Sequence, residues 1–383
     1  MAELLFTSDA FCPNGLSVAE VPILVDHRMH LVEPACAWLL YISLVRGRTQ
    51  SPNTWRTYGE ALYDWWQTLE ANGWSWNDIG VHEVAAYRNK MLTSVSFLTG
   101  RPCSRSTING RIRIISLFYS WCKAQTLITN TPFGDRGVFV KRFAPARVLV
   151  HLGADGGWQQ ANDLTVRHTK PLPRPIAPWA IRQVVARLNA RDRLIVEWAV
   201  MTGARRMEIA GLKRSVIDRI RANREDLPVV PIRLDITKGG KVRYIYPPLA
   251  LIDRTRAYIR EERAVILRKA RTRQTSFRET DVLFITRRGK AMTPRRVGMM
   301  FGQACAAAEV TGTFHSLRHT FAGIMLGFLQ QQTGRHPEMN PLLTLQTILG
   351  HADIATTGIY LKMLATDLTA IEDAIASLYS TLI

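Results

Sequence analysis

The sequence has few cysteines and no long apolar run. Its five cysteines are odd in number and widely separated, without a Cys-x-x-Cys pair, which excludes a disulfide framework and a zinc site of the usual spacing. No stretch of about 18 uncharged apolar residues occurs, and the N-terminal MAELLFTSDAF lacks the basic start and apolar centre of a signal peptide. We therefore expect a soluble protein with reduced cysteines that is not exported.

Two further absences narrow the class. The sequence contains neither an internal repeat nor a cluster of carboxylates with metal-ligand spacing, so a solenoid and a two-metal nuclease are not expected, and no cofactor is implied. With 47% hydrophobic and 21% charged residues, the chain has enough apolar side chains to form sizeable hydrophobic cores. Its 383 residues are too many for a single core. We expect a globular protein of two domains.

The charge is strongly basic and unevenly distributed. The net charge is +19, and an excess of this size favours a polyanionic partner, either nucleic acid or an anionic membrane surface. Residues 1–98 hold 6 basic and 10 acidic residues, residues 99–175 hold 12 and 3, and residues 176–383 hold 32 and 18. The first quarter of the chain is therefore not the part that binds the polyanion.

Apolar periodicity predicts a small helical bundle in the first third. Residues 53–69, 82–95 and 106–125 repeat apolar side chains at spacings of three and four, the period of an amphipathic helix. The tryptophans of the first helix are interpreted as core rather than as stacking platforms for bases. The predicted organisation is an N-terminal extension (1–30), a helical bundle (31–130), a basic Pro- and Gly-containing linker (131–177) and a second domain (178–383).

The sequence of the last domain, residues 178–383, predicts an α+β fold. Residues 178–201 predict two helices, and 254–273 a basic helix. Between them SVIDRI, VVPIRLDIT and KVRYIYP read as strands, the last two joined by a hairpin around Gly239 and Gly240. At the C-terminus, leucines and isoleucines of 361–383 form a narrow apolar seam, which packs against its own domain or docks on a neighbouring protomer.

Four separated clusters carry chemistry. TGARRME places Arg205 and Glu208 on one helix face, either as an ordinary surface pair or as an arginine oriented by a carboxylate. Lys238 lies at the hairpin, where it is either solvated or able to reach a phosphate. HSLR places His315 beside Arg318, an imidazole with a bidentate cation, which suits a phosphodiester. The fourth, LGHADIATTGIY, contributes His351 and Tyr360, a phenol that needs nearby cations and a base to act as a nucleophile. His319 is interpreted as packing or capping.

Together these clusters resemble, in order, the catalytic set of the tyrosine recombinase (phage integrase) family: Arg, an acidic residue, Lys, His-x-x-Arg, His or Trp, and Tyr. The matching positions are Arg205, Glu208, Lys238, His315, Arg318, His351 and Tyr360. The resemblance covers about residues 178–365, and the helical region resembles the core-binding domain of the family. Residues 1–30 are not basic and do not resemble an arm-binding module, and residues 327–341 lengthen the usual connection.

The resemblance implies a fold and an activity. The fold is mainly α with a small antiparallel β-sheet, a helical core-binding domain and an α+β catalytic domain forming a C-shaped clamp around DNA. The activity is site-specific cleavage and rejoining of DNA through a 3′-phosphotyrosine on Tyr360, within a homotetramer, in the cytoplasm at the nucleoid. Arg205 and Arg318 would bind the phosphate, Lys238 would protonate the leaving oxygen, and His315 would assist at Tyr360. Candidate DNA-binding residues are Arg105, Arg111, Arg113, Lys141, Arg142 and Lys241.

Other functions remain open at this stage. Integration or excision of a mobile element is favoured over Xer-like resolution of dimers. A telomere resolvase and a type IB topoisomerase use similar chemistry, but the LGH motif and the two-domain layout favour a recombinase. A non-catalytic DNA-binding relative would not need all seven positions. A membrane-surface protein fits least, because the basic residues surround phosphate-handling motifs.

Overall fold

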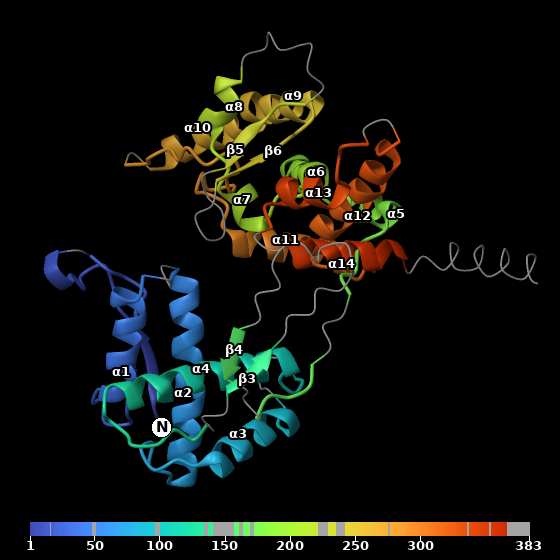
Figure 1. Cartoon of the computed structure of the whole chain (residues 1–383). Coiled ribbons are helices and arrows are strands. Elements are labelled where there is room, and N and C mark those ends of the chain that lie inside the picture. Colours follow the sequence, from blue (N-terminus) through green and yellow to red (C-terminus); the bar gives the residue numbers. More distant parts are fainter. Residues whose placement is uncertain are drawn as a thin grey trace, which may run out of the picture. The chain divides into compact units, whose positions relative to one another are not determined.

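The chain folds into two compact units, residues 1–170 and 171–383 (Figure 1). The computed structural model describes residues 1–15, 17–47, 51–95, 100–133, 137–140, 157–160, 164–168, 172–220, 229–234, 242–274, 276–334, 337–351 and 354–365. These residues form helices and two-stranded antiparallel sheets, which confirms the predicted mainly α fold class. Within the same ranges no helix is long and apolar enough to cross a membrane.

The first unit is a helical bundle with a hairpin on its edge. Its elements are β1 (Glu3–Phe6), a 3-10 turn (Pro13–Gly15), β2 (Pro22–Val25), α1 (Glu33–Leu40), a π-helical turn (Tyr41–Val45), α2 (Pro52–Asn72), α3 (Val81–Thr93), α4 (Arg105–Ala124), β3 (Gly137–Val140) and β4 (Gly157–Gln160). Three of them, α2, α3 and α4, confirm the helices predicted from periodicity.

Aromatic side chains fill the core of this bundle. Trp38 and Trp65 are almost completely buried. The ring of Trp38 meets that of Phe118 edge to face, with centroids 5.6 Å apart, and the indole N–H of Trp65 donates to Tyr119 Oη at 3.3 Å. The prediction that the tryptophans of α2 are core residues is therefore confirmed.

Residues 1–30 share that core. Strands β1 and β2 pair antiparallel, with Glu3 opposite Val25, and Val21 and Leu24 are fully buried against the helices. Helix α2 approaches β2 so closely that a Cβ at Gly59 would lie 2.5 Å from Pro22 Cβ. The hairpin is thus packed onto the bundle and belongs to the same hydrophobic core.

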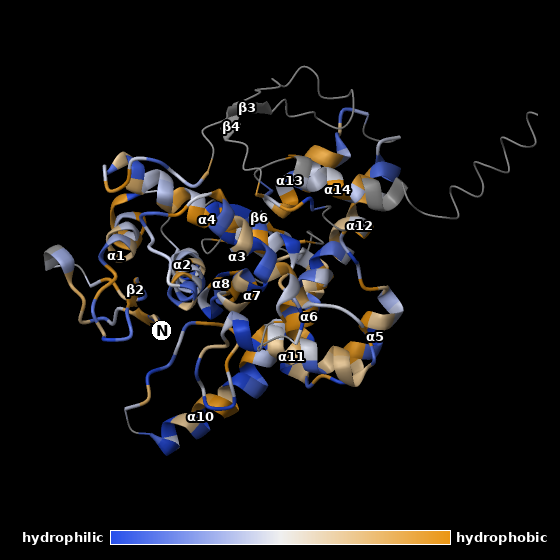
Figure 2. Ribbon diagram, turned by 90° about the horizontal axis from the view of Figure 1, so that it is seen from below, coloured by the Kyte–Doolittle hydropathy of each residue, from blue (hydrophilic) through white to orange (hydrophobic). Residues whose placement is uncertain are grey.

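The second unit is built around one buried helix, α6. The elements are α5 (Pro178–Ala186), α6 (Ala190–Thr202), α7 (Arg206–Ala210), α8 (Arg214–Arg219), β5 (Ile232–Leu234), β6 (Arg243–Ile245), α9 (Leu249–Tyr258), a π-helical turn (Ile259–Arg263), α10 (Ala264–Arg273), α11 (Pro294–Ala307), α12 (Phe314–Gln332), α13 (Pro341–Leu349) and α14 (Ile354–Ala365). Helix α6 packs against α7, α9, α11 and α12 and carries hydrophobic segments in Figure 2, as expected of a helix buried on several faces.

Strands β5 and β6 form the antiparallel pair that the sequence predicted, with Arg233 opposite Tyr244. The predicted turn, residues 238–241, lies outside the described residues. SVIDRI, however, is helix α8 and not a strand. Its β-branched residues favour a strand locally, but Ile217 is fully buried in the core and the backbone N–H of Ser215 donates to Asp281 Oδ1 at 3.1 Å. Tertiary packing overrides propensity here.

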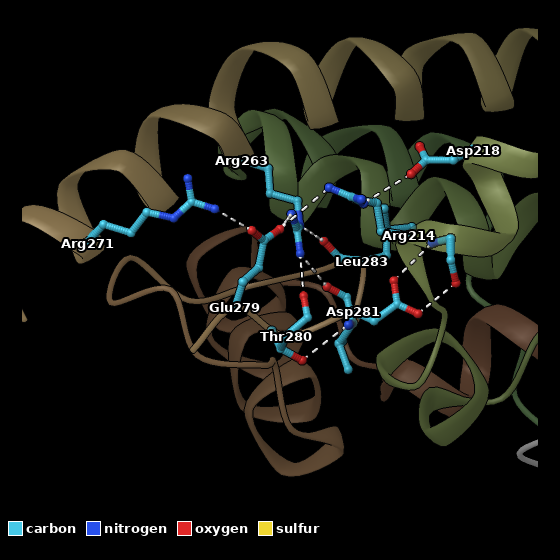
Figure 3. Close-up of polar contacts among 10 residues, drawn as sticks. Arg214, Asp218, Arg263, Arg271, Glu279, Thr280, Asp281 and Leu283 are labelled. Carbon is cyan, nitrogen blue, oxygen red and sulfur yellow. Dashed lines mark hydrogen bonds and ion pairs between the residues drawn. The ribbon is translucent and has the colours of Figure 1, made fainter. Parts of the chain in front are cut away.

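A charged network fastens the segment after α10 to helices α8 and α10 (Figure 3). The guanidinium of Arg263, at the end of the π-helical turn, is 1% exposed and donates to Glu279 Oε1 at 2.8 Å and to the carbonyl of Thr280 at 2.6 Å. Arg271 and Arg214 contact the same carboxylate at 2.7 and 3.5 Å. The hydrogen bond from Arg263 is the main reason that the pKa of Glu279 is lowered.

We predict that Glu279→Gln destabilises the second unit by about 1–3 kcal/mol, because it removes the charge that faces buried Arg263. The native pKa of Glu279 is below its ordinary value, so this contribution is present at neutral pH and is lost as the pH falls through the native pKa. Native-state hydrogen exchange of the α10 amides measures it. Arg271→Gln, which removes a 63% exposed partner, is the control and should cost less than about 1 kcal/mol. Equal effects of the two variants would contradict the prediction.

Candidate active site

The first arginine of the site leaves a turn that requires glycine. Helix α6 ends at Gly203, whose φ is +61°, a conformation that costs little only for glycine. A Cβ at Gly203 would also lie 2.3 Å from the ring of Phe321. The turn places Arg205 at the N-cap of α7, where Glu208 accepts from the Arg205 backbone N–H at 2.6 Å and from Arg205 Nη1 at 3.0 Å.

Glu208 lies between two arginines. Its carboxylate, 1% exposed, also accepts from Arg243 Nη2 at 2.5 Å and from Arg243 Nε at 3.1 Å, so each of its oxygens is shared by the two arginines. Burial opposes its ionisation, but the hydrogen bonds and charges of Arg243 and Arg205 outweigh burial and lower the pKa of Glu208. Glu208 is therefore an anion that hydrogen-bonds two guanidinium groups.

Arg243 was not identified from the sequence. It is buried on β6 and also donates from Nη1 to the carbonyl of Ile348 at 2.7 Å. Arg243 and buried Ile245 lie two residues apart and share the buried face of β6. In the sequence, the sign of a buried arginine was therefore a charged residue at an inward-facing strand position. Unlike an exposed hairpin arginine, it connects β6 to α7 and to the end of α13.

Arg318 is the central buried cation. It lies on α12, is 1% exposed, and donates from Nη1 to the carbonyl of Gly203 at 2.5 Å and from Nη2 to that of Leu349 at 2.6 Å. Burial, followed by the charges of Arg205 and Arg243, lowers the pKa of Arg318 to about 9. The group remains cationic at neutral pH.

His351 follows a second turn that requires glycine. Gly350 has φ of +62°, and a Cβ there would lie 2.6 Å from Arg243 Cδ. The turn ends α13 and directs His351 Nδ1 to Thr357 Oγ1 at 2.9 Å. Burial and the charges of the nearby arginines lower the pKa of His351 to about 4, so the imidazole is neutral at pH 7.

Tyr360 is packed inside a small core shared by α12, α13 and α14. The residue is 2% exposed, and its ring is nearly parallel to that of His351, with centroids 6.4 Å apart. Burial raises the pKa of Tyr360, and the charges of Arg318 and Arg205 oppose that rise. The phenol is therefore protonated at neutral pH.

The contact on the Tyr360 hydroxyl corrects one sequence-based interpretation. His319 Nδ1 lies 2.9 Å from Tyr360 Oη, so His319 is not merely a packing or capping residue. His315 is exposed on the preceding turn, and the two imidazoles meet with centroids 4.6 Å apart. A spacing of four residues puts them on one helix face.

The remaining predicted site residues either lie outside the described residues or belong to helix α4. Lys238, Lys241, Lys141 and Arg142 lie outside the described residues. On α4, Arg113 is exposed, whereas Arg105 donates to the carbonyl of Arg167 at 3.1 Å. Arg111 donates to Asp64 Oδ2 at 2.6 Å, and Tyr87 donates to the same oxygen. The guanidinium of Arg111 is thus engaged inside the bundle.

The geometry is that of a site for a phosphodiester. Cationic Arg205 and Arg318, neutral imidazoles and a phenol converge from α7, α12, α13 and α14, and the described residues show no group of His, Cys, Asp or Glu suited to a metal ion. Fixed cations stabilise charge on phosphate oxygens, and a phenol next to a neutral imidazole is a nucleophile with a proton acceptor. The arrangement suits phosphoryl transfer to a tyrosine.

Comparison with known proteins agrees with this chemistry. Residues 180–366 match the phage integrase family. The chain is 25% identical over 295 residues to tyrosine recombinase XerD of Ralstonia nicotianae, covering 75% of this chain and 85% of that protein. It is 30% identical over 175 residues to tyrosine recombinase XerC of Anoxybacillus flavithermus, covering 45% of this chain and 50% of that protein. The chain thus spans about half the length of that XerC relative.

Solved structures show the same fold. The XerH site-specific recombinase bound to a palindromic difH substrate matches with a TM-score of 0.52 at 19% identity, over 88% of this chain and 82% of that one. A lambda integrase dimer bound to a core site gives 0.51 at 16% identity, over 85% and 94%. The Tn1549 transposon integrase with circular intermediate DNA gives 0.53 at 18%, over 86% and 94%. Residues 180–366 therefore form a domain of the phage integrase family, and the relatives that match the chain are tyrosine-type site-specific recombinases.

We predict that Arg243→Met destabilises the second unit by about 3–5 kcal/mol, because it leaves the buried Glu208 carboxylate without its closest partner. The stabilisation by ionised Glu208 is present at neutral pH and is lost as the pH falls through its lowered native pKa, so the variant should lose less stability on acidification than the parent. Urea unfolding at neutral and acidic pH measures both. Arg233→Met, at the exposed position opposite Tyr244, is the matched control, and a loss as small as the control's would refute the role of Arg243.

Proposed function

We propose that the chain binds double-stranded DNA and exchanges its strands through a 3′-phosphotyrosine on Tyr360. The observation that carries this proposal is the position of the Tyr360 phenol, held among neutral imidazoles and within the field of Arg318 and Arg205. A covalent phosphotyrosine conserves the energy of the broken phosphodiester, so rejoining needs no energy cofactor.

Each residue has a proposed role in the step. Tyr360 Oη forms a bond to the scissile phosphorus while the bond to the 5′-oxygen breaks, and a second 5′-hydroxyl later reverses the reaction. Arg205 and Arg318 stabilise charge on the nonbridging oxygens, and His351 hydrogen-bonds the phosphate. Lys238 protonates the leaving oxygen, as the family resemblance implies. Glu208 acts through the arginines that it orients.

DNA binding is supported by charge and by relatives. The whole excess of positive charge lies in residues 99–383, because residues 1–98 hold more acidic than basic residues. The XerH, lambda and Tn1549 structures are complexes with DNA. Arg105 and Arg113 on α4 are exposed and are proposed to contact phosphates, together with Lys141, Arg142 and Lys241. The engagement of Arg111 with Asp64 makes it the weakest candidate of this group.

The biological role is proposed to be integration or excision of a mobile element. The lambda and Tn1549 neighbours are named as integrases, whereas the XerD and XerC relatives favour the alternative of Xer-like resolution. We further propose a homotetramer on DNA, joined through residues 361–383, and a nucleoid location. Short inverted repeats in the DNA flanking the gene would favour the mobile-element role, and their absence would favour resolution.

We predict that Tyr360→Phe abolishes covalent attachment, because the variant lacks the oxygen that attacks phosphorus. A nicked suicide substrate traps the parent as a denaturation-resistant protein–DNA adduct, which gel electrophoresis detects. Binding of the same duplex should be unchanged. An adduct formed by Tyr360→Phe would show that another residue is the nucleophile.

We also predict that Arg205→Lys suppresses cleavage by about 10²-fold or more while leaving affinity for DNA within a few-fold of the parent, because lysine lacks the planar fork that binds both Glu208 and phosphate. Single-turnover cleavage and gel-shift titration measure the two effects. Parallel loss of both would indicate a folding or binding role for Arg205.

A further inference from the structure

We propose that His319 is the proton acceptor for Tyr360: its Nδ1 holds the phenolic hydroxyl and takes the proton when the oxygen attacks phosphorus. This inference rests on the proposed role of Tyr360 as the nucleophile. It assigns to His319 the step that the resemblance to the family had given to His315.

The contact is direct and sheltered. His319 Nδ1 lies 2.9 Å from Tyr360 Oη, and the ring centroids are 5.8 Å apart. Tyr360 is 2% exposed and His319 is half-buried. A buried hydroxyl needs a hydrogen-bond partner within the protein, and here that partner is an imidazole nitrogen. The pair is built into the packing of α12 against α14.

Each partner is in the protonation state from which the step starts, and because the two pKa shifts oppose transfer in the free protein, the proton moves only as Tyr360 Oη bonds to phosphorus. Burial, with the charges of His315 and Arg318, lowers the pKa of His319 to about 4, so the ring is neutral at pH 7. With its proton on Nε2, the ring presents the Nδ1 lone pair to the phenol. Burial raises the pKa of Tyr360, so the phenol does not ionise at neutral pH without an acceptor.

The other histidines are placed differently. His351 directs Nδ1 to Thr357 Oγ1 at 2.9 Å, and Thr357 is completely buried. His315 lies one turn before His319 and is exposed. The two rings pack edge to face, with centroids 4.6 Å apart. His319 is the residue whose imidazole nitrogen lies within hydrogen-bond distance of the reacting oxygen, at 2.9 Å.

The proposed step is balanced. The bond from Tyr360 Oη to phosphorus forms as the bond from phosphorus to the 5′-oxygen breaks, and the phenolic proton moves to His319 Nδ1 to give an imidazolium. Arg318 and His315 lie near this charge and oppose it, so it is transient. When a 5′-hydroxyl attacks the phosphotyrosine, the same proton returns to the tyrosine oxygen.

The first test compares His319→Ala and His319→Gln in single-turnover cleavage of a nicked suicide substrate. At pH 7 both should lose about 10²- to 10⁴-fold in rate with unchanged DNA affinity, because neither side chain accepts a proton. Their rates should rise about tenfold per pH unit above neutrality, since hydroxide then removes the phenolic proton. Glutamine retains a hydrogen-bond acceptor of similar reach, so it tests the step even where alanine impairs folding.

The second test removes the need for the leaving group to be protonated. A substrate with sulfur in place of the bridging 5′-oxygen should restore cleavage to Lys238→Ala, and it should not restore cleavage to His319→Gln. Restoration of His319→Gln by sulfur would place His319 at the leaving group and overturn the proposal. His82→Ala, an exposed histidine on α3, is the matched control and should cleave both substrates like the parent.

The outcomes separate this inference from the proposed function. An adduct formed by Tyr360→Phe removes the premise that Tyr360 is the nucleophile. If Tyr360→Phe is inactive but His319→Gln cleaves at the parental rate, or faster, only the assignment of His319 fails. An alkaline rate profile in His315→Gln, with a parental profile in His319→Gln, would return the role to His315.

Discussion

Three arginines donate hydrogen bonds to three consecutive backbone carbonyls at the C-terminus of α13. The site depends on this set of contacts, the arginine clasp. The pairs are Arg243 with Ile348, Arg318 with Leu349 and Arg205 with Gly350. The last carbonyls of a helix have no partner within the helix and lie at the negative end of its dipole. Guanidinium groups from β6, α12 and α7 satisfy them together. The same contacts fix the turn from which His351 projects, so packing and chemistry share one set of hydrogen bonds.

The clasp leaves an excess of positive charge. Arg205, Arg243 and Arg318 converge with a single buried carboxylate, Glu208, and their mutual repulsion is part of the reason that the pKa of Arg318 is lowered. Repulsion between buried like charges costs free energy in the protein alone. A bound phosphate would offset that cost, so the site favours an anionic ligand.

The sequence was most informative where a local pattern determines the outcome. Helices α2, α3 and α4 follow from apolar spacing. Arg205 and Glu208 follow from a motif whose glycine turn can be read directly, and Arg318 follows from its spacing to His315. It was least informative where partners come from distant segments. Ile217 is helical because a remote core receives it, Arg243 is buried because Glu208 lies opposite, and His319 reaches Tyr360 only through the packing of α12 on α14. Lys238 and residues 366–383 lie outside the described part of the chain.

The β1–β2 hairpin limits how the protein can be dissected. Val21 and Leu24 belong to the core of the first unit, and Gly59 of α2 packs closely against Pro22. A fragment beginning at residue 31 would therefore expose apolar side chains of α1 and α2 to solvent. Loss of DNA affinity in such a fragment would report misfolding as readily as a lost contact. Dissection of DNA recognition is better done by substitution on the exposed face of α4 than by trimming the N-terminus.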